Sequence, residues 1–277
     1  MFEKFIFTPV ISFIDEAVSS LNVCSQSIAM QPIIKYTLNA LYLQVTGTIE
    51  QKLFFITWQI ATKENDIRYD VFRGDLKAMS TLEAKEKVYR NLIRKIRENT
   101  GFSPYTLPSV TLFNSAKKCI DKIITLSPFC SCFSKKISLY QSLSNDISSH
   151  MLDFTYTQKD AESYDLLREI KSGCLTDKNE NMGRNNKKGK LGETRDGGLL
   201  GFKNDLLARI YNDFIYKKRN LIAHNTKKIP ELTISEIFSG KEFMFDNIFI
   251  QLLVLIYIDK IFIYLYNDYK NHSKCII

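Results

Sequence analysis

The run Leu252-Leu253-Val254-Leu255-Ile256-Tyr257-Ile258 is the uninterrupted apolar centre of a longer segment, Phe243 to Tyr266. Charged residues such as Asp246, Asp259 and Lys260 interrupt the rest of this segment. A membrane-spanning helix needs about 20 mostly apolar residues without charges at its centre. The pattern therefore favours a buried helix of a helical bundle, and a membrane-associated helix is the distant alternative.

Apolar residues recur at intervals of three and four along most of the remaining chain, which is the helical period. We expect helices over about 11–21, 33–61, 81–100, 109–126, 136–151, 158–171, 199–225 and 243–269, with a short piece at 233–238. Within 33–61, Gly47 is the candidate junction of two helices, and Ile49, Leu53, Ile56 and Ile60 share one face. Within 199–225, the apolar stripe is formed by Leu206, Ile210, Phe214 and, less regularly, Leu221 and Ile222. No strand pairing is convincing and no repeat is found. The predicted fold class is all-α, with residues 1–277 forming a single domain.

Residues 176–198 break this pattern. They are rich in Lys, Asn, Gly, Glu, Asp and Arg, and Met182 and Leu191 are their only sizeable apolar residues. Such a segment buries too little surface to offset its ordering entropy, so a flexible basic loop is predicted. The loop is interpreted either as a plain insertion or as a basic clamp that folds onto nucleic acid.

Composition narrows the class of protein. Of the 277 residues, 45% are hydrophobic and 25% charged, the balance of a folded globular protein. The net charge of +8 favours anionic partners such as RNA, DNA or an acidic membrane face, without choosing among them. The six cysteines lack the spacing of a disulfide framework, and the start of the chain does not resemble a signal peptide. We therefore expect a cytoplasmic protein without membrane attachment.

The segment Tyr216-Lys217-Lys218-Arg219-Asn220-Leu221-Ile222-Ala223-His224-Asn225-Thr226 carries the most informative polar cluster. Cleavage of RNA needs a group that moves protons at neutral pH and a group that stabilises charge on the phosphate. His224 suits the first task because histidine titrates near pH 6.5, and Arg219 suits the second because its planar guanidinium is always charged. The amide of Asn220 can orient either group.

Helical spacing limits how these groups can meet. Asn220 and His224 are four residues apart and share a face, whereas Arg219 lies about 140° around the helix from His224. Arg219 must therefore wrap toward the groove, or the phosphate must reach it from a second subunit. The alternative without a catalytic role is that Arg219 and His224 lie on a solvated helix end, where the helix dipole favours cations.

Arg219-Asn220-Leu221-Ile222-Ala223-His224-Asn225 resembles the Rx4-6H signature of the HEPN superfamily, in which a polar residue follows the arginine. Good agreement covers roughly Leu206 to Tyr269. The helix around Gly47 to Trp58 is similar to an earlier helix of the family, which often supplies an acidic or polar residue to the active groove. Glu50 is the matching residue. The first 30 residues and the region 66–157 show no such match.

The resemblance implies an antiparallel helical bundle with additional helices, in which two subunits of a homodimer bring two motifs into one cleft. It implies metal-independent cleavage of RNA, with tRNA a candidate target, that leaves a cyclic phosphate end and uses no cofactor. Many such proteins act in antiphage defence or toxin–antitoxin systems, so an antitoxin or regulatory protein is a candidate partner.

Carried over to this chain, the resemblance assigns roles to single residues. His224 handles the proton, Arg219 stabilises the phosphorane charge, and Asn220 positions both, with Glu50 beside them. Lys217 and Lys218 are expected to bind flanking phosphates, although a solvated surface explains them equally well. The alternative function is a non-catalytic HEPN module that binds RNA, a nucleotide or a protein partner.

Overall fold

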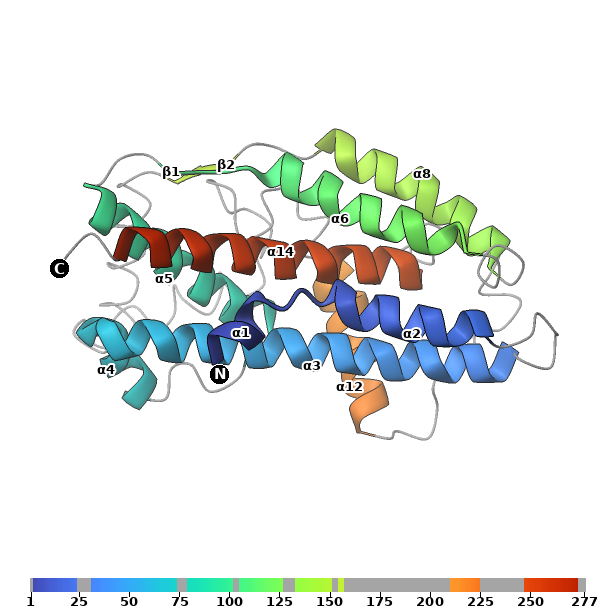
Figure 1. Cartoon of the computed structure of the whole chain (residues 1–277), viewed down its shortest axis with the longest axis horizontal. Helices are drawn as coiled ribbons and strands as arrows, with labels where there is room; N and C mark the ends of the chain where they lie inside the picture. Colours follow the sequence, from blue (N-terminus) through green and yellow to red (C-terminus); the bar gives the residue numbers. More distant parts are fainter. Residues whose placement is uncertain are drawn as a thin grey trace, which may run out of the picture.

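The computed structural model describes residues 2–23, 31–73, 79–101, 105–126, 133–150, 154–156, 210–224 and 247–273, and these are mostly helical (Figure 1). The all-α prediction is confirmed at this level. The main helices are α1 (Phe2–Phe7), α2 (Ile11–Val23), α3 (Gln31–Lys63), α4 (Asn65–Arg73), α5 (Leu82–Thr100), α6 (Ser109–Ile124), α8 (Ser134–His150) and α14 (Ile248–Ser273). The elements predicted at 158–171, 176–198 and 233–238 lie outside the described residues.

Helix α14 is the centre of the bundle. It contacts α5, α6, α3 and α8, and Figure 1 shows it between a layer formed by α6 and α8 and a layer formed by α2 and α3. Every residue of Leu252–Ile258 is buried. Asn247 precedes the helix, and its Oδ1 accepts a hydrogen bond from the backbone N–H of Phe249 at 3.0 Å. This cap satisfies a donor that the helix leaves unpaired and explains why α14 begins at Ile248.

Burial of α14 bears on the membrane alternative. Within the described ranges, α14 is the one helix whose length and composition suit a membrane span, and 83% of its most apolar 18-residue window is buried in the molecule. A core helix has the same composition as a membrane span. The packing of α14 against its neighbours is that of a core helix.

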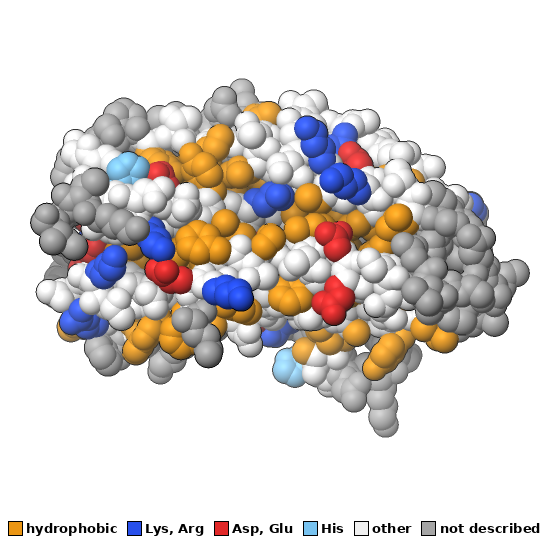
Figure 2. All heavy atoms as spheres, viewed as in Figure 1, with side chains coloured by type: hydrophobic (Ala, Val, Ile, Leu, Met, Phe, Trp, Pro, Cys, Tyr) orange, Lys and Arg blue, Asp and Glu red, His pale blue; other side chains and the backbone are white. Residues whose placement is uncertain are grey.

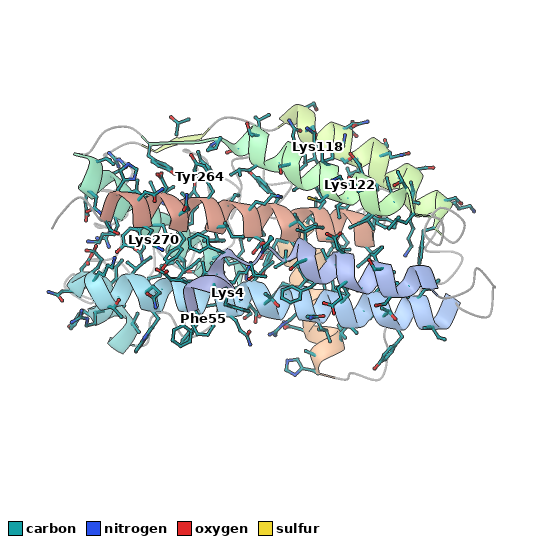
Figure 3. All side chains as sticks on the ribbon, in the orientation of Figure 1. Lys4, Phe55, Lys118, Lys122, Tyr264 and Lys270 are labelled. Atoms are coloured by element: carbon teal, nitrogen blue, oxygen red, sulfur yellow. The ribbon has the colours of Figure 1, made fainter. Side chains whose placement is uncertain are left out.

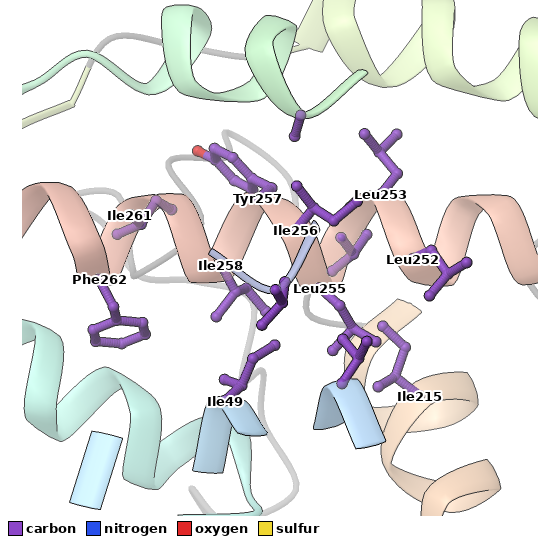
Figure 4. Close-up of a cluster of buried hydrophobic side chains, with 14 of the residues drawn as sticks. Ile49, Ile215, Leu252, Leu253, Leu255, Ile256, Tyr257, Ile258, Ile261 and Phe262 are labelled. Atoms are coloured by element: carbon purple, nitrogen blue, oxygen red, sulfur yellow. The ribbon is translucent and has the colours of Figure 1, made fainter. Parts of the chain in front are cut away.

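Helix α3 is continuous through Gly47, so the predicted junction of two helices is wrong. A glycine inside a helix costs about 1 kcal/mol relative to alanine, and the packing of the flanking turns outweighs that cost. The predicted stripe is confirmed, because Ile49, Leu53, Ile56 and Ile60 are all buried. Figure 4 shows Ile49 facing the apolar side chains of α14.

Local signals explain both ends of α5. The Thr81 hydroxyl accepts a hydrogen bond from the N–H of Ala84 at 3.2 Å, and Gly101 ends the helix in the left-handed region with φ of 83°. After Gly101, β1 (Tyr105–Leu107) pairs antiparallel with β2 (Phe154–Tyr156). The sequence analysis missed this pairing because three residues are too few to show an alternating pattern.

A buried ion pair ties three parts of the bundle together. Lys52 Nζ on α3 lies 2.5 Å from Asp259 Oδ1 on α14, and both side chains are 2% exposed. The second carboxylate oxygen of Asp259 accepts the N–H of Val10, which precedes α2, at 2.9 Å. Burial raises the pKa of Asp259 and lowers the pKa of Lys52, while each charge favours the ionised form of the other. Asp259 therefore acts as a structural anchor.

Candidate functional site

The candidate site is carried by two short helices in direct succession, η3 (Ile210–Tyr216) and α12 (Lys217–Ala223). The sequence predicted an α-helix with Ile210 and Phe214 on its buried face. The structure instead has a π-helix at η3, in which residues five apart share a face. Ile210 and Ile215 are buried, whereas Phe214 is only half-buried, so the predicted stripe is wrong beyond Ile210.

Tyrosine hydroxyls fix η3 against the bundle. Tyr42 on α3 donates to the carbonyl of Ile215 at 2.7 Å, and Tyr211 on η3 donates to the carbonyl of Ser80 at 2.9 Å. Helix α12 continues from this clamped segment, contacts α3 and buries none of its residues. Figure 1 shows α12 steeply inclined to α3 and extending past the outer edge of that helix. The motif is therefore held rigidly at its base and exposed at its tip.

Three of the predicted site residues come together. Arg219 Nη2 donates to Glu50 Oε2 at 2.9 Å, and Arg219 Nη1 donates to Asn220 Oδ1 at 3.1 Å. The Arg219 and Glu50 side chains are 28% and 20% exposed, so a ligand in solution can reach the pair. The guanidinium retains further N–H donors beyond these two bonds, which suits it to an additional oxyanion.

His224 lies apart from this cluster, at the exposed C-terminal end of α12. Its backbone N–H donates to the carbonyl of Asn220 at 3.0 Å, which places His224 one helical turn beyond Asn220. Among the described residues, the imidazole has no hydrogen bond or ion pair, and none joins it to Arg219. Within one chain, the structure therefore groups Arg219, Asn220 and Glu50 and leaves the histidine facing solvent.

The two lysines before Arg219 differ in position. Lys217 is exposed, whereas Lys218 is half-buried. Lys218 Nζ donates to Gln251 Oε1 of α14 at 3.2 Å and lies 5.4 Å from the centre of the Tyr42 ring. To reach a phosphate, the Lys218 ammonium must leave both of these partners.

Sequence reasoning missed a lysine beneath the site. Lys85 on α5 is 1% exposed, donates to the carbonyls of Met79 at 2.6 Å and Ser80 at 3.1 Å, and lies 4.9 Å from the Tyr211 ring centre. Burial lowers the pKa of Lys85 to about 7, the charge of Glu50 opposes this shift, and Arg219 adds to it.

One feature of the sequence marks Lys85 in retrospect. It occupies the apolar stripe of α5 at helical spacing from Tyr89, Leu92 and Ile96, all of which are buried. A lysine on such a stripe lies inside the bundle or turns its chain toward an edge, and the tertiary contacts decide which. In this protein Lys85 joins η3 to the turn that precedes α5, and so supports the candidate site from below.

Across the described part of the chain, no group of three His, Cys, Asp or Glu side chains is arranged to hold a metal ion. Comparison of the chain with protein-family models, curated proteins and solved structures finds no match. The function of the site must therefore be inferred from the chemistry of its side chains.

Proposed function

We propose that this protein is a metal-independent endoribonuclease of HEPN type, acting in the cytoplasm as a homodimer, in antiphage defence or a toxin–antitoxin system. The observation that carries the proposal is the partly exposed Arg219, held by Glu50 and Asn220 on a helix whose next turn ends in the exposed His224. The same short helix thus presents a permanent positive charge and, one turn further on, an exposed imidazole. The chain's net charge of +8 favours a polyanionic substrate.

The proposed reaction needs no external cofactor. A ribose 2′-OH loses its proton and attacks the adjacent phosphorus, the bond to the 5′ oxygen breaks, and that oxygen takes up a proton, which leaves a 2′,3′-cyclic phosphate. His224 is the group that moves the proton, and Arg219 stabilises the charge that develops on the phosphate oxygens. Asn220 and Glu50 hold the guanidinium in place, and Lys217 binds a flanking phosphate.

The proposed homodimer supplies what a single chain leaves separate. Because no hydrogen bond or ion pair among the described residues joins His224 to Arg219, the imidazole of one subunit is expected to act beside the guanidinium of the other. Helix α12 buries none of its residues, and Leu221 at its surface is 38% exposed, so α12 has an open face for a second copy. A two-fold axis near α12 brings the two motifs together.

Substitution of His224 tests the proposal. The variant His224→Ala should cleave tRNA and total RNA about 100- to 10,000-fold more slowly than the wild type, because a general acid–base group contributes that factor. Its RNA affinity and thermal stability should change little, since the side chain is exposed. His272→Ala is the matched control, because that histidine lies on α14, where its Nδ1 is 2.9 Å from the carbonyl oxygen of Asp268.

The conditions of the assay decide between mechanisms. Wild-type cleavage should persist in EDTA and yield fragments that end in cyclic phosphate. Intact RNA after incubation with purified wild-type protein, with and without divalent metal, would contradict the proposal.

One observation favours the second candidate function, a non-catalytic HEPN module that binds RNA, a nucleotide or a protein partner. Among the described residues, no hydrogen bond or ion pair joins His224 to Arg219, so one chain does not assemble the two groups that cleavage requires. Binding of tRNA without cleavage by the wild type, and with equal affinity by His224→Ala, would establish this alternative.

A further inference from the structure

Two aromatic side chains stand side by side on the outer face of α3. The rings of Phe54 and Trp58 are nearly parallel, with an interplanar angle of 12° and centroids 6.5 Å apart. Phe54 is 52% exposed and Trp58 is 44% exposed, although aromatic side chains of this size are normally well buried. Both rings therefore offer apolar faces to a ligand from solution.

A further aromatic side chain packs against Phe54 of this pair. Phe55 packs edge-on against Phe54 with centroids 5.9 Å apart, and its other neighbours are Phe2 at 4.6 Å and Phe5 at 5.6 Å, both from α1. Figure 3 shows Phe55 and Lys4 at the outer edge of α3, where α1 crosses it. This packing limits the rotation of the Phe54 ring, so little conformational entropy is lost when a ligand stacks on it.

The aromatic pair lies on the same stripe as the candidate site. Glu50, Phe54 and Trp58 follow one another at intervals of four residues, and each interval advances about 6 Å along the helix. Glu50 holds Arg219, so the stripe leads directly from the proposed phosphate-binding guanidinium to the two rings. A single RNA strand gripped at Arg219 therefore has a path along α3.

The size of the patch favours a nucleobase over a protein partner. The exposed residues next to the pair on α3 are polar, Gln51 on one side and Thr62 on the other. Phe2, which packs on Phe55, is 47% exposed and extends the patch to three rings. A stable protein interface buries about 800 Å² on each partner, which three half-exposed rings do not supply. Figure 2 shows hydrophobic side chains interspersed with lysines or arginines along the outer edge of α3, as base stacking beside a phosphate backbone requires.

We propose that Phe54 and Trp58 form a stacking platform for a nucleobase of single-stranded RNA bound at the candidate site. This inference rests on the proposed function, because it names the part of the same substrate that lies beside the scissile phosphate. Stacking is tolerant of sequence, since every base has an aromatic face, and it requires an unpaired strand. The platform therefore makes single-stranded loops or ends the preferred substrate and disfavours a continuous duplex.

Trp58 is the single tryptophan of the chain, so its fluorescence reports the platform directly. The experiment uses the full-length His224→Ala protein, which keeps the probe intact, and a ten-nucleotide oligoadenylate. Stacking should quench the Trp58 emission, and inorganic polyphosphate, a polyanion without bases, should leave it unchanged. A double-stranded RNA of equal charge should quench it far less.

Substitutions on the same background measure the contribution of the platform. Phe54→Ala should weaken oligoadenylate binding by about 5- to 100-fold, the range expected for the loss of one base-stacking ring. Phe54→Leu, which keeps an apolar contact with Phe55, should show the same loss. Tyr36→Ala is the control, because Tyr36 is 77% exposed on the same helix but lies about 27 Å from Phe54 along the axis.

The outcomes separate this inference from the function it builds on. Unquenched emission at saturating RNA, or unchanged affinity of both Phe54 variants, would overturn the platform while wild-type cleavage still stood. A Trp58 emission that changes with protein concentration alone, together with a weaker dimer in Phe54→Ala, would assign the rings to a second copy and also overturn it. Intact RNA in the wild-type assay counts against the nuclease and leaves the stacking measurement as an independent test.

Discussion

Two charged residues of α3, Glu50 and Lys52, belong to very different regions although only one residue separates them. Two positions along a helix correspond to about 200° of rotation, so the side chains leave α3 on nearly opposite sides. Lys52 points into the bundle and pairs with Asp259, whereas Glu50 points outward and pairs with Arg219. Both are ion pairs between α3 and a later helix, and they differ mainly in exposure.

The difference in exposure between the two ion pairs suits one of them to a structural role and the other to binding a ligand. Removing one partner of a buried pair leaves an uncompensated charge in the core, so the Lys52–Asp259 pair cannot exchange partners without unfolding the region. The Glu50–Arg219 pair remains in contact with solvent, where an ion pair contributes little stability. Arg219 can therefore exchange a carboxylate for a phosphate at small cost, and this property suits it to a substrate.

The largest effect is expected at the buried pair. Lys52→Met should lower the free energy of unfolding by about 3–5 kcal/mol, because the Asp259 carboxylate is left without its counterion. Chemical denaturation measures the loss, and Lys63→Met at the exposed end of α3 is the control, with a change within about 0.5 kcal/mol. The double variant Lys52→Met with Asp259→Leu should recover part of the loss. A double variant less stable than Lys52→Met would contradict this account of the anchor.

A smaller, pH-dependent effect is expected at Lys85, which is as buried as Lys52 but has no carboxylate partner among the contacts described above. Its pKa is about 7 in the folded protein and 10.5 ordinarily. Between these values the unfolded chain binds more protons, so the free energy of unfolding should rise with pH. The slope should be roughly 1 kcal/mol per pH unit between pH 7 and 9.

Lys85→Met should abolish this contribution, so its stability should depend less on pH than that of the wild type. Denaturation at pH 7, 8 and 9 measures the slopes, and Lys118→Met, an exposed lysine of α6, should keep the wild-type slope. Equal slopes for Lys85→Met and the wild type would show that the ammonium stays charged, held by the two carbonyls and the Tyr211 ring.

The smallest change in stability is expected at the outer pair. Glu50→Gln should alter the free energy of unfolding by less than about 1 kcal/mol, because the pair is partly exposed. If Glu50 positions Arg219, RNA cleavage should fall by at least about tenfold in the same variant. A loss of stability equal to that of Lys52→Met would mean that both pairs are structural, and the comparison between them would fail.

The sequence predicts the positions of the helices more accurately than it predicts the geometry inside each helix. The buried stripe of α3 and the start of α5 at Thr81 follow from local spacing and capping. The π-helix at η3 does not, because the choice between four- and five-residue spacing depends on how Ile215 and Tyr211 fit against α3 and α5. The short pairing of β1 with β2 is likewise a contact between segments far apart in sequence.

The candidate site divides in the same way. Arg219, Asn220 and His224 were chosen from chemistry and spacing within one segment, and Glu50 from resemblance. The contact between Glu50 and Arg219 joins positions that are 169 residues apart. The packing around Lys85 and the contact of Phe55 with Phe2 likewise depend on segments that are distant in the sequence. The spacing of residues within one segment does not predict which distant segments will be in contact with it.

Local patterns were sufficient to identify a mostly helical chain, its central apolar helix and the segment that holds Arg219, Asn220 and His224. Helix formation and capping depend on neighbours within a few residues, so these features can be predicted from the sequence. Which charges are buried, which face solvent and which meet one another was decided only by the packing of the bundle. Lys52 and Glu50 each carry one charge, of opposite sign, and are almost adjacent in the sequence. Only the positions of α14 and α12 around α3 make Lys52 part of a structural anchor and Glu50 part of the candidate site.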